Sequence, residues 1–277
     1  MSTLSSPRSL VFLALIGLAG PALACSETAS HTIGIVGDAA VREGAPAFAD
    51  GWTVQFEQFV VVVHHPALIE QTNDDPAWVR RLGVTVWDVA AELEPDTESF
   101  EIYSAGLRAS KYDGFDFRIA PASAAGYPAE AGNVEASVVD AMVEDDLAIH
   151  VVGSATDGTS TIAFDWAFTT DTLYRCGIDI ELAGEEEGSS VIEIAGERLF
   201  ATGLGAAAPT LAFAAIADAD ANADGTVTLD ELGAVSLASA GYDANGEAVE
   251  DLGAFVAALS RSVGGVVDSS GCEIVED

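Results

Sequence analysis

Short segments of alternating apolar and polar residues fill the chain between residues 51 and 203, and they set the fold class. In most of them every second residue is apolar, which is the period of a strand that buries one face. Gly, Asp and Pro separate the segments, without regular strand–helix alternation. This pattern predicts an antiparallel β-sandwich over residues 51–203 rather than a parallel α/β sheet. The predicted strands lie in residues 52–63, 84–89, 115–119, 147–152, 161–168, 176–182 and 191–194.

After residue 203 the sequence becomes rich in Ala, which predicts a small helical domain over residues 204–277. A first helix is expected over residues 210–219, because Pro209 suits a first helical turn. Residues 229–240 and 249–259 carry apolar residues at helical spacing. The stripe in the last segment predicts burial in a core; it consists of Val249, Leu252, Phe255, Val256 and Leu259.

The N-terminus has the pattern of a cleaved signal peptide over residues 1–24. Arg8 precedes an apolar run over residues 10–19, and the small residues 22–24 form an A-x-A cleavage site. Residues 25–50 are rich in Ala and Gly, which indicates a tether. No later apolar run reaches the ~18–20 residues needed to span a bilayer, so we expect a soluble exported body.

The three cysteines fit an exported protein. Cys25 directly follows the predicted cleavage site and resembles the lipid-modified first residue of bacterial lipoproteins, although Ala22 stands where that motif prefers Leu. Lipid anchoring and simple secretion both stay open, so the expected location is periplasmic, outer-surface or extracellular. In an oxidising compartment Cys176 and Cys272 can pair, and a closed loop near 100 residues is worth up to ~4.7 kcal/mol.

Acidic residues outnumber basic ones, with 45 Asp plus Glu against 10 Lys plus Arg among 277 residues. Such a surface repels phosphate backbones and anionic lipids, which argues against nucleic-acid binding. It favours divalent cations, basic partners or a saline environment.

One segment between the predicted helices, residues 220–231, carries the pattern of a calcium-binding loop. Calcium takes six to eight oxygen ligands, which one tight loop can supply. Gly225 permits the positive φ of a sharp turn, and Val227 suits a short β-bridge with a partner loop. Glu231 supplies a bidentate carboxylate. The six predicted ligands are Asp220, Asn222, Asp224, Thr226, Thr228 and Glu231.

Residues 209–240 therefore resemble the EF-hand family, whose D-x-[DN]-x-[DN]-G-x5-E pattern matches at every specified position. The resemblance implies bound Ca2+ that braces the loop. EF-hands normally occur in pairs, but the only candidate partner starts at Asp243 and has Ala248 and Ala254 where Gly and Glu are needed. It is either a metal-free pseudo-partner or an ordinary turn. Dockerin modules use a similar loop, but they need a second copy of it, which this chain lacks. A dockerin function is therefore disfavoured.

No nucleophile elbow, zinc helix, C-x-x-C pair or phosphate-binding glycine loop is present, which favours a non-catalytic protein. His64 and His65 are adjacent on a predicted strand, so they are expected to face opposite sides. The alternative function is a surface adhesin or glycan-binding module, with Trp78 as the exposed aromatic residue, whereas Trp52 and Trp166 are expected in the core.

The order of export signal, strand at residues 52–59, β domain, EF-hand and terminal Cys is also similar to uncharacterised bacterial surface lipoproteins. Some of these carry an H-x-D-H stretch where this chain has Ala-Gly-Glu-Arg at residues 195–198. That departure puts a second, transition-metal site in doubt.

Overall fold

The computed structural model describes residues 28–70, 77–80, 83–124, 126–184, 187–206 and 208–275, with the backbone alone at 77–80. The predicted signal peptide, Cys25 and the side chain of Trp78 lie outside this description, so their roles stay predictions. None of the helices within these ranges is long and apolar enough to cross a membrane.

Strands dominate the described chain, which confirms the prediction of a mainly β protein. The smaller sheet has the order β13 (Gly264–Val266), β11 (Glu187–Ile194), β1 (Thr28–Gly37), β5 (Phe100–Arg108). The larger sheet has the order β12 (Thr226–Val227), β9 (Thr161–Phe168), β8 (Ile149–Thr156), β2 (Thr53–Glu70), β6 (Ser110–Ile119), β10 (Thr172–Leu182), β14 (Cys272–Val275). Beside this path, β3 (Ala77–Arg80) and β4 (Val84–Asp88) pair with β2, and β7 (Ala129–Ala131) pairs with β4.

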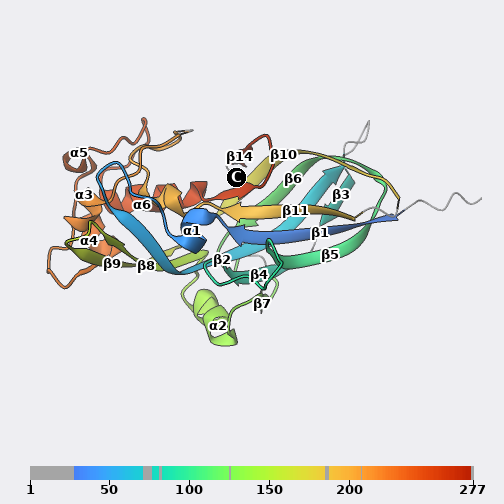
Figure 1. Cartoon of the computed structure of the whole chain (residues 1–277), viewed down its shortest axis with the longest axis horizontal. Helices are drawn as coiled ribbons and strands as arrows, with labels where there is room; N and C mark the ends of the chain where they lie inside the picture. The colour runs from blue at the N-terminus through green and yellow to red at the C-terminus, as the bar shows by residue number, and fades with distance from the viewer. Residues whose placement is uncertain are drawn as a thin grey trace, which may run out of the picture.

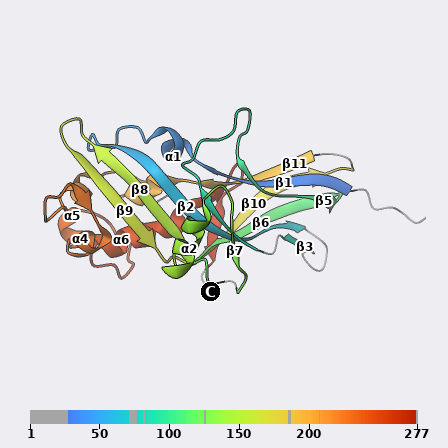
Figure 2. The same ribbon diagram turned by 90° about the horizontal axis from the view of Figure 1, so that it is seen from below.

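The long strand β2 joins two ends of the molecule (Figure 1). Its first half pairs with β8 and its second half with β6, both antiparallel. We call β8, β9, β12 and the helices α3 to α6 the helical end. We call β1, β5 and β11, together with β6, β10 and β14, the sandwich end. Figures 1 and 2 place the short helices against β8 and β9 at one extremity of the long axis, with β5 and β6 toward the other.

The prediction of a tether over residues 25–50 is wrong for the described part of that range. Residues Thr28–Gly37 form β1, which lies inside the smaller sheet, parallel to β11 and antiparallel to β5. The helix α1 (Ala39–Glu43) follows. The glycines that suggested flexibility instead allow close packing: a Cβ at Gly34 would lie 2.3 Å from Ser99 Oγ, and one at Gly37 would lie 2.6 Å from Val89 O.

The C-terminal helices are short and share the core of the strands, so the described part of residues 204–277 forms no separate helical domain. They are α3 (Ala214–Ala217), α4 (Leu229–Gly233), α5 (Leu237–Ala240) and α6 (Leu252–Leu259). The stripe predicted to be buried does lie in a core: Leu252, Phe255 and Val256 are at most 1% exposed. They belong to the same buried cluster as Ile35 of β1 and Phe117 of β6.

The helix boundaries also differ from prediction. Helix α3 starts only at Ala214, because the preceding segment is extended: Ala212 N donates to Phe200 O at 3.0 Å. The helix expected over 229–240 is divided into α4 and α5, since Leu252 N donates to Val235 O at 2.9 Å between them. The helix α2 (Ala136–Glu144), which the sequence analysis does not predict, covers a second buried cluster on β2 and β4.

Candidate functional site

The first half of the loop at residues 220–231 is closed by its own backbone amides. The Asp220 carboxylate accepts hydrogen bonds from Asp224 N at 3.1 Å and Gly225 N at 2.9 Å. Asn222 Oδ1 accepts from Asp224 N at 2.8 Å, and Asp224 Oδ1 accepts from Thr226 N at 2.8 Å. Gly225 has φ +82°, the conformation for which the sequence required glycine. The three predicted ligands Asp220, Asn222 and Asp224 therefore line one tight turn.

The second half of the loop ends in a capping box at the start of α4. Thr228 caps the helix: its Oγ1 accepts from Glu231 N at 3.3 Å, while Glu231 Oε2 accepts from Thr228 N and Thr228 Oγ1, each at 2.9 Å. Such a reciprocal pair satisfies two amides at the helix start. The other carboxylate oxygen, Glu231 Oε1, is buried and has no hydrogen-bond partner among the described residues.

In this conformation the carboxylates are turned toward amides rather than toward one point. Within the described ranges, no group of three or more His, Cys, Asp or Glu side chains is arranged to hold a metal ion. The oxygen atoms nevertheless have capacity left, because each carboxylate oxygen has two lone pairs. The orphan oxygen of Glu231 stands out among them, because a buried acceptor without a partner is costly and in native proteins has a ligand, water or ion as its usual explanation.

The second half of the loop at residues 220–231 pairs with the larger sheet. Thr226 and Val227 form β12, which pairs in parallel with Ala163 and Phe164 of β9. Ala163 N donates to Gly225 O at 2.8 Å, and the buried indole Nε1 of Trp166 donates to Val227 O at 2.9 Å. The apolar residue at position 8 of the loop predicted a β-bridge, but its pairing with β9 depends on tertiary packing and has no signal in the sequence.

The segment starting at Asp243 forms a turn that pairs with Gly203, which precedes the loop at residues 220–231. Its Asp243 Oδ1 accepts from Asn245 N at 2.8 Å, and Asp243 pairs with Gly203 in an isolated bridge. Asn245 and Gly246 both have positive φ. This turn therefore pairs with residue 203 rather than with the loop at residues 220–231. Of the two interpretations left open by the sequence, this pairing favours an ordinary turn over a pseudo-partner of the loop.

The expectation that His64 and His65 face opposite sides is wrong. The pairing of β2 with β6 shifts register between His64 and Ala67, and His65 has φ +47°, so the strict alternation of the strand is lost. Both rings line one pocket of about 200 Å³, with centroids 6.0 Å apart. Burial lowers the pKa of His64, whose Nε2 lies 3.0 Å from Ala120 O. Asp116 and Arg175 also line this pocket and form an ion pair.

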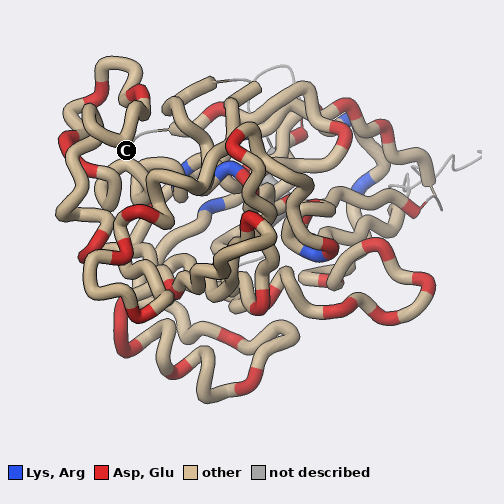
Figure 3. The backbone as a smooth tube through the Cα atoms, turned by 60° about the vertical axis from the view of Figure 1, so that its left-hand side comes forward, with Lys and Arg blue, Asp and Glu red and all other residues tan. Residues whose placement is uncertain are grey.

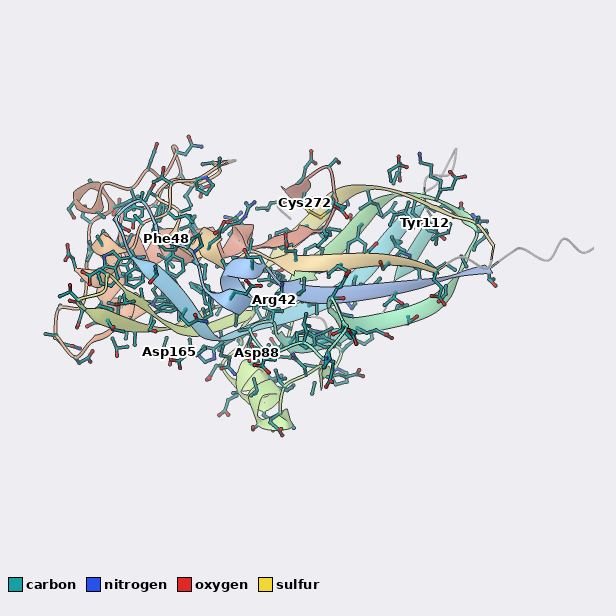
Figure 4. All side chains as sticks on the ribbon, in the orientation of Figure 1. Arg42, Phe48, Asp88, Tyr112, Asp165 and Cys272 are labelled. Carbon is teal, nitrogen blue, oxygen red and sulfur yellow. A yellow bond between two sulfur atoms is a disulfide. The ribbon has the colours of Figure 1, made fainter. Side chains whose placement is uncertain are left out.

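The two cysteines named as disulfide candidates are joined in the structure. Cys176 on β10 lies directly opposite Cys272 on β14, and the disulfide between them closes a sequence separation of 96 residues. Figure 4 shows Cys272 near the upper side of the molecule, close to β10. The link fixes the last described strand to the larger sheet. Both cysteines border a surface pocket of about 720 Å³.

Trp52 and Trp166 are buried, as expected, and Trp87 is only 7% exposed. His150 lies with Nε2 2.7 Å from Asp165 Oδ1. Comparison with protein-family models, with curated proteins and with solved structures found no match to this chain.

Proposed function

We propose that this chain is an exported, non-catalytic protein of EF-hand type that binds one calcium ion in the loop at residues 220–231, where the ion braces the helical end. The observation that carries the proposal is the pairing of an intact loop pattern with a buried, partnerless carboxylate oxygen on Glu231. An ionised carboxylate oxygen has lone pairs and no hydrogen to donate, so its partner must carry positive charge or donate a hydrogen bond. A cation meets this requirement.

The donor set fits calcium in chemistry and in number. All six candidate ligands offer oxygen, as hard cations require, and a bidentate Glu231 brings the count within the six to eight oxygens that calcium takes. With Asp220, Asp224 and Glu231 in the shell, three negative charges face two positive ones, so the site would be net −1. The formal charge of −35 over the chain raises the local concentration of cations further.

Binding requires local changes that turn the ligand oxygens toward one point, and among them Glu231 Oε2 must be released from Thr228. The capping hydrogen bonds at 2.9 Å hold that oxygen against the helix start. Loss of the Glu231 half of the capping box costs about 1 kcal/mol, which sets a modest penalty on binding. Asp220 keeps its amide donors, since its oxygens have further lone pairs.

The proposal of export rests on the signal-peptide pattern and is supported by the disulfide. A disulfide between Cys176 and Cys272 persists in the oxidising compartments outside the cytosol. Whether Cys25 carries a lipid is a separate question, which intact-mass measurement of the mature chain decides. A mass increase of a diacylglyceryl and acyl group indicates anchoring, and the unmodified mass indicates secretion.

The test is a calcium titration by calorimetry of the exported chain, with a thermal melt at each calcium level. Glu231→Gln keeps the size of the side chain but removes the charge of the bidentate ligand. We expect one-site binding in the natural protein, an affinity at least tenfold weaker in Glu231→Gln, and a melting temperature that rises with calcium only where binding occurs.

A matched control separates ligation from general charge. Asp230→Asn removes the same charge from the adjacent residue, which is not a predicted ligand. It should bind calcium nearly as tightly as the natural chain. If Glu231→Gln and Asp230→Asn weaken binding equally, or if neither the natural chain nor the variants bind calcium, the proposed site is wrong.

A further inference from the structure

Two residues of the loop at residues 220–231, Thr226 and Val227, form the edge strand β12 of the larger sheet. We propose that β9 takes the place of a second EF-hand loop, so that calcium binding at residues 220–231 and closure of the sheet edge at β9 are one coupled event. This inference rests on the proposed function, because it names what the ion regulates: the attachment of the helical end to the β-sheet.

The backbone link joins the middle of the loop to β9. Gly225, which makes the sharp turn, accepts a hydrogen bond from Ala163 N at 2.8 Å, and the next two residues form β12. Thr226, whose carbonyl is a predicted ligand, lies opposite Ala163 in this ladder. A shift of the loop away from calcium-binding geometry therefore strains the ladder, and a loss of the ladder loosens a ligand.

A side-chain link reinforces the backbone link. The indole of Trp166 is fully buried and donates to Val227 O at 2.9 Å, one residue after Thr226. Its ring stacks on Phe164 with centroids 4.7 Å apart and contacts Phe200 at 5.8 Å. The hydrogen bond thus attaches the loop to a buried aromatic cluster.

The entrance to the loop is fixed to the same cluster. Phe213 directly precedes α3 and lies 5.7 Å from the ring of Phe200. Asp50 Oδ2 accepts from Phe213 N at 2.6 Å and from Ala214 N at 2.7 Å, which caps the helix that leads into the loop. The segment that leads into the loop and the middle of the loop are therefore both attached to one set of aromatic rings, which limits the conformations that the loop can adopt before an ion arrives.

Such preorganisation lowers the entropy that a single loop loses on binding. Coupling is reciprocal: if the ladder to β9 favours calcium binding, then calcium favours the ladder by the same factor. Among the described residues β12 is the strand that pairs with the outer edge of β9, and it covers Ala163 and Phe164. Removal of calcium is thus expected to expose this edge, the kind of open strand that proteins normally cover.

The experiment measures hydrogen exchange and calcium affinity on the full exported chain. In the natural protein, amide exchange in residues 161–168 should slow on addition of calcium, by up to about 100-fold at 100 times the dissociation constant. Exchange in residues 172–182 of β10 should change far less. Trp166→Phe removes the indole donor to Val227 O and should weaken calcium binding about threefold to tenfold.

The control is Trp87→Phe, which makes the same substitution where the buried indole Nε1 has no hydrogen-bond partner among the described residues. It should leave calcium affinity unchanged. Calcium binding with no slowing of exchange at residues 161–168, and with equal affinity in the two variants, overturns the coupling and leaves the proposed function standing. A natural chain without calcium binding overturns both. If Trp166→Phe fails to fold, the exchange measurement on the natural chain still decides.

Discussion

At the sandwich end, carboxylates lie beside arginines, whereas at the helical end the loop carboxylates accept hydrogen bonds from backbone amides. Arg175 pairs with Asp116 at 3.0 Å, and Arg108 pairs with Glu70. The hydrogen bonds from Arg108 and Ser110 lower the pKa of Glu70. In the loop, Asp220 and its neighbours depend on the N–H groups of a tight turn instead.

This difference follows from the composition. With 45 acidic and 10 basic residues, few carboxylates can have an arginine or lysine partner (Figure 3). Backbone amides supply partial positive charge to an anion, but they do not neutralise it. The loop at the helical end is therefore a place where an external cation can contribute, whereas Asp116 and Glu70 are already paired with arginines.

The two ends also differ in what holds them together. The disulfide between Cys176 and Cys272 fixes the last strand of the sandwich end. The helical end has an aromatic cluster in place of a covalent link; Phe48, labelled in Figure 4, lies 5.5 Å from Phe200 within it. Short helices of four to eight residues cannot be stable alone, so their stability comes from this packing.

Phe200→Ala should have the largest effect. The ring is fully buried and contacts Phe48, Phe56, Phe164, Trp166 and Phe213. Its removal leaves a cavity, and we expect the free energy of unfolding to fall by about 3 to 5 kcal/mol in a denaturant titration. Hydrogen exchange should increase in β8 and β9 more than in β10.

The control for this variant is Phe100→Ala, on the edge strand β5, where the ring is only partly buried beside Trp87. Phe100→Ala should lower the free energy of unfolding clearly less than Phe200→Ala does. Equal losses from the two substitutions, or faster exchange first in β10, would show that the aromatic cluster does not particularly support the helical end.

Joint replacement of Cys176 and Cys272 by Ala should affect the opposite end. The link closes 96 residues of separation, and loss of a native disulfide typically lowers the free energy of unfolding by about 2 to 5 kcal/mol. Exchange should rise in β10 and β14 before it rises in β9. A reductant should bring the natural chain to the stability of the double variant and leave the variant unchanged; an effect of reductant on the variant would refute this reading.

The strands are predicted well where large apolar residues alternate regularly with polar ones. The segment 161–168 corresponds to β9, and residues 84–89 to β4. The prediction fails for β1, because Gly34 and Gly37 allow close packing, which composition cannot distinguish from flexibility. It fails for His64 and His65 because a register shift depends on the partner strand.

For the candidate site, the local part could be predicted and the long-range part could not. The positive φ of Gly225 and the capping role at Thr228 follow from residue type within a dozen positions. The pairing with β9 joins residues 63 positions apart, from Ala163 to Thr226, and depends on how the sheet presents its edge. Helix ends were misplaced for the same reason, since extended hydrogen bonds at Ala212 replace a helical turn.

Asp38→Asn tests the start of α1, between β1 and β2, and should have the smallest effect. Asp38 caps α1 through Val41 N at 2.8 Å. The pKa of Asp38 is raised from 3.8 to about 6, mainly by burial and also by the nearby charges of Glu197 and Glu193, against the lowering effect of the amide hydrogen bond from Val41. Because the folded-state pKa is the higher one, the stability contributed by the protonated form is present below pH 3.8 and lost as pH rises through about 6.

Asn keeps the cap but carries no charge, so the variant escapes that loss. The difference in the free energy of unfolding, variant minus natural chain, should be small near pH 4 and grow to about 1 to 2 kcal/mol above pH 6, a value reduced for solvent screening at this partly exposed group. Denaturant titrations across that range measure it. Glu197→Gln should lower the pH midpoint of the difference, because it removes one of the charges that oppose ionisation. A difference that is constant with pH would mean that Asp38 ionises as freely in the folded chain as in the unfolded one, against the raised pKa that burial and the charges of Glu197 and Glu193 give it.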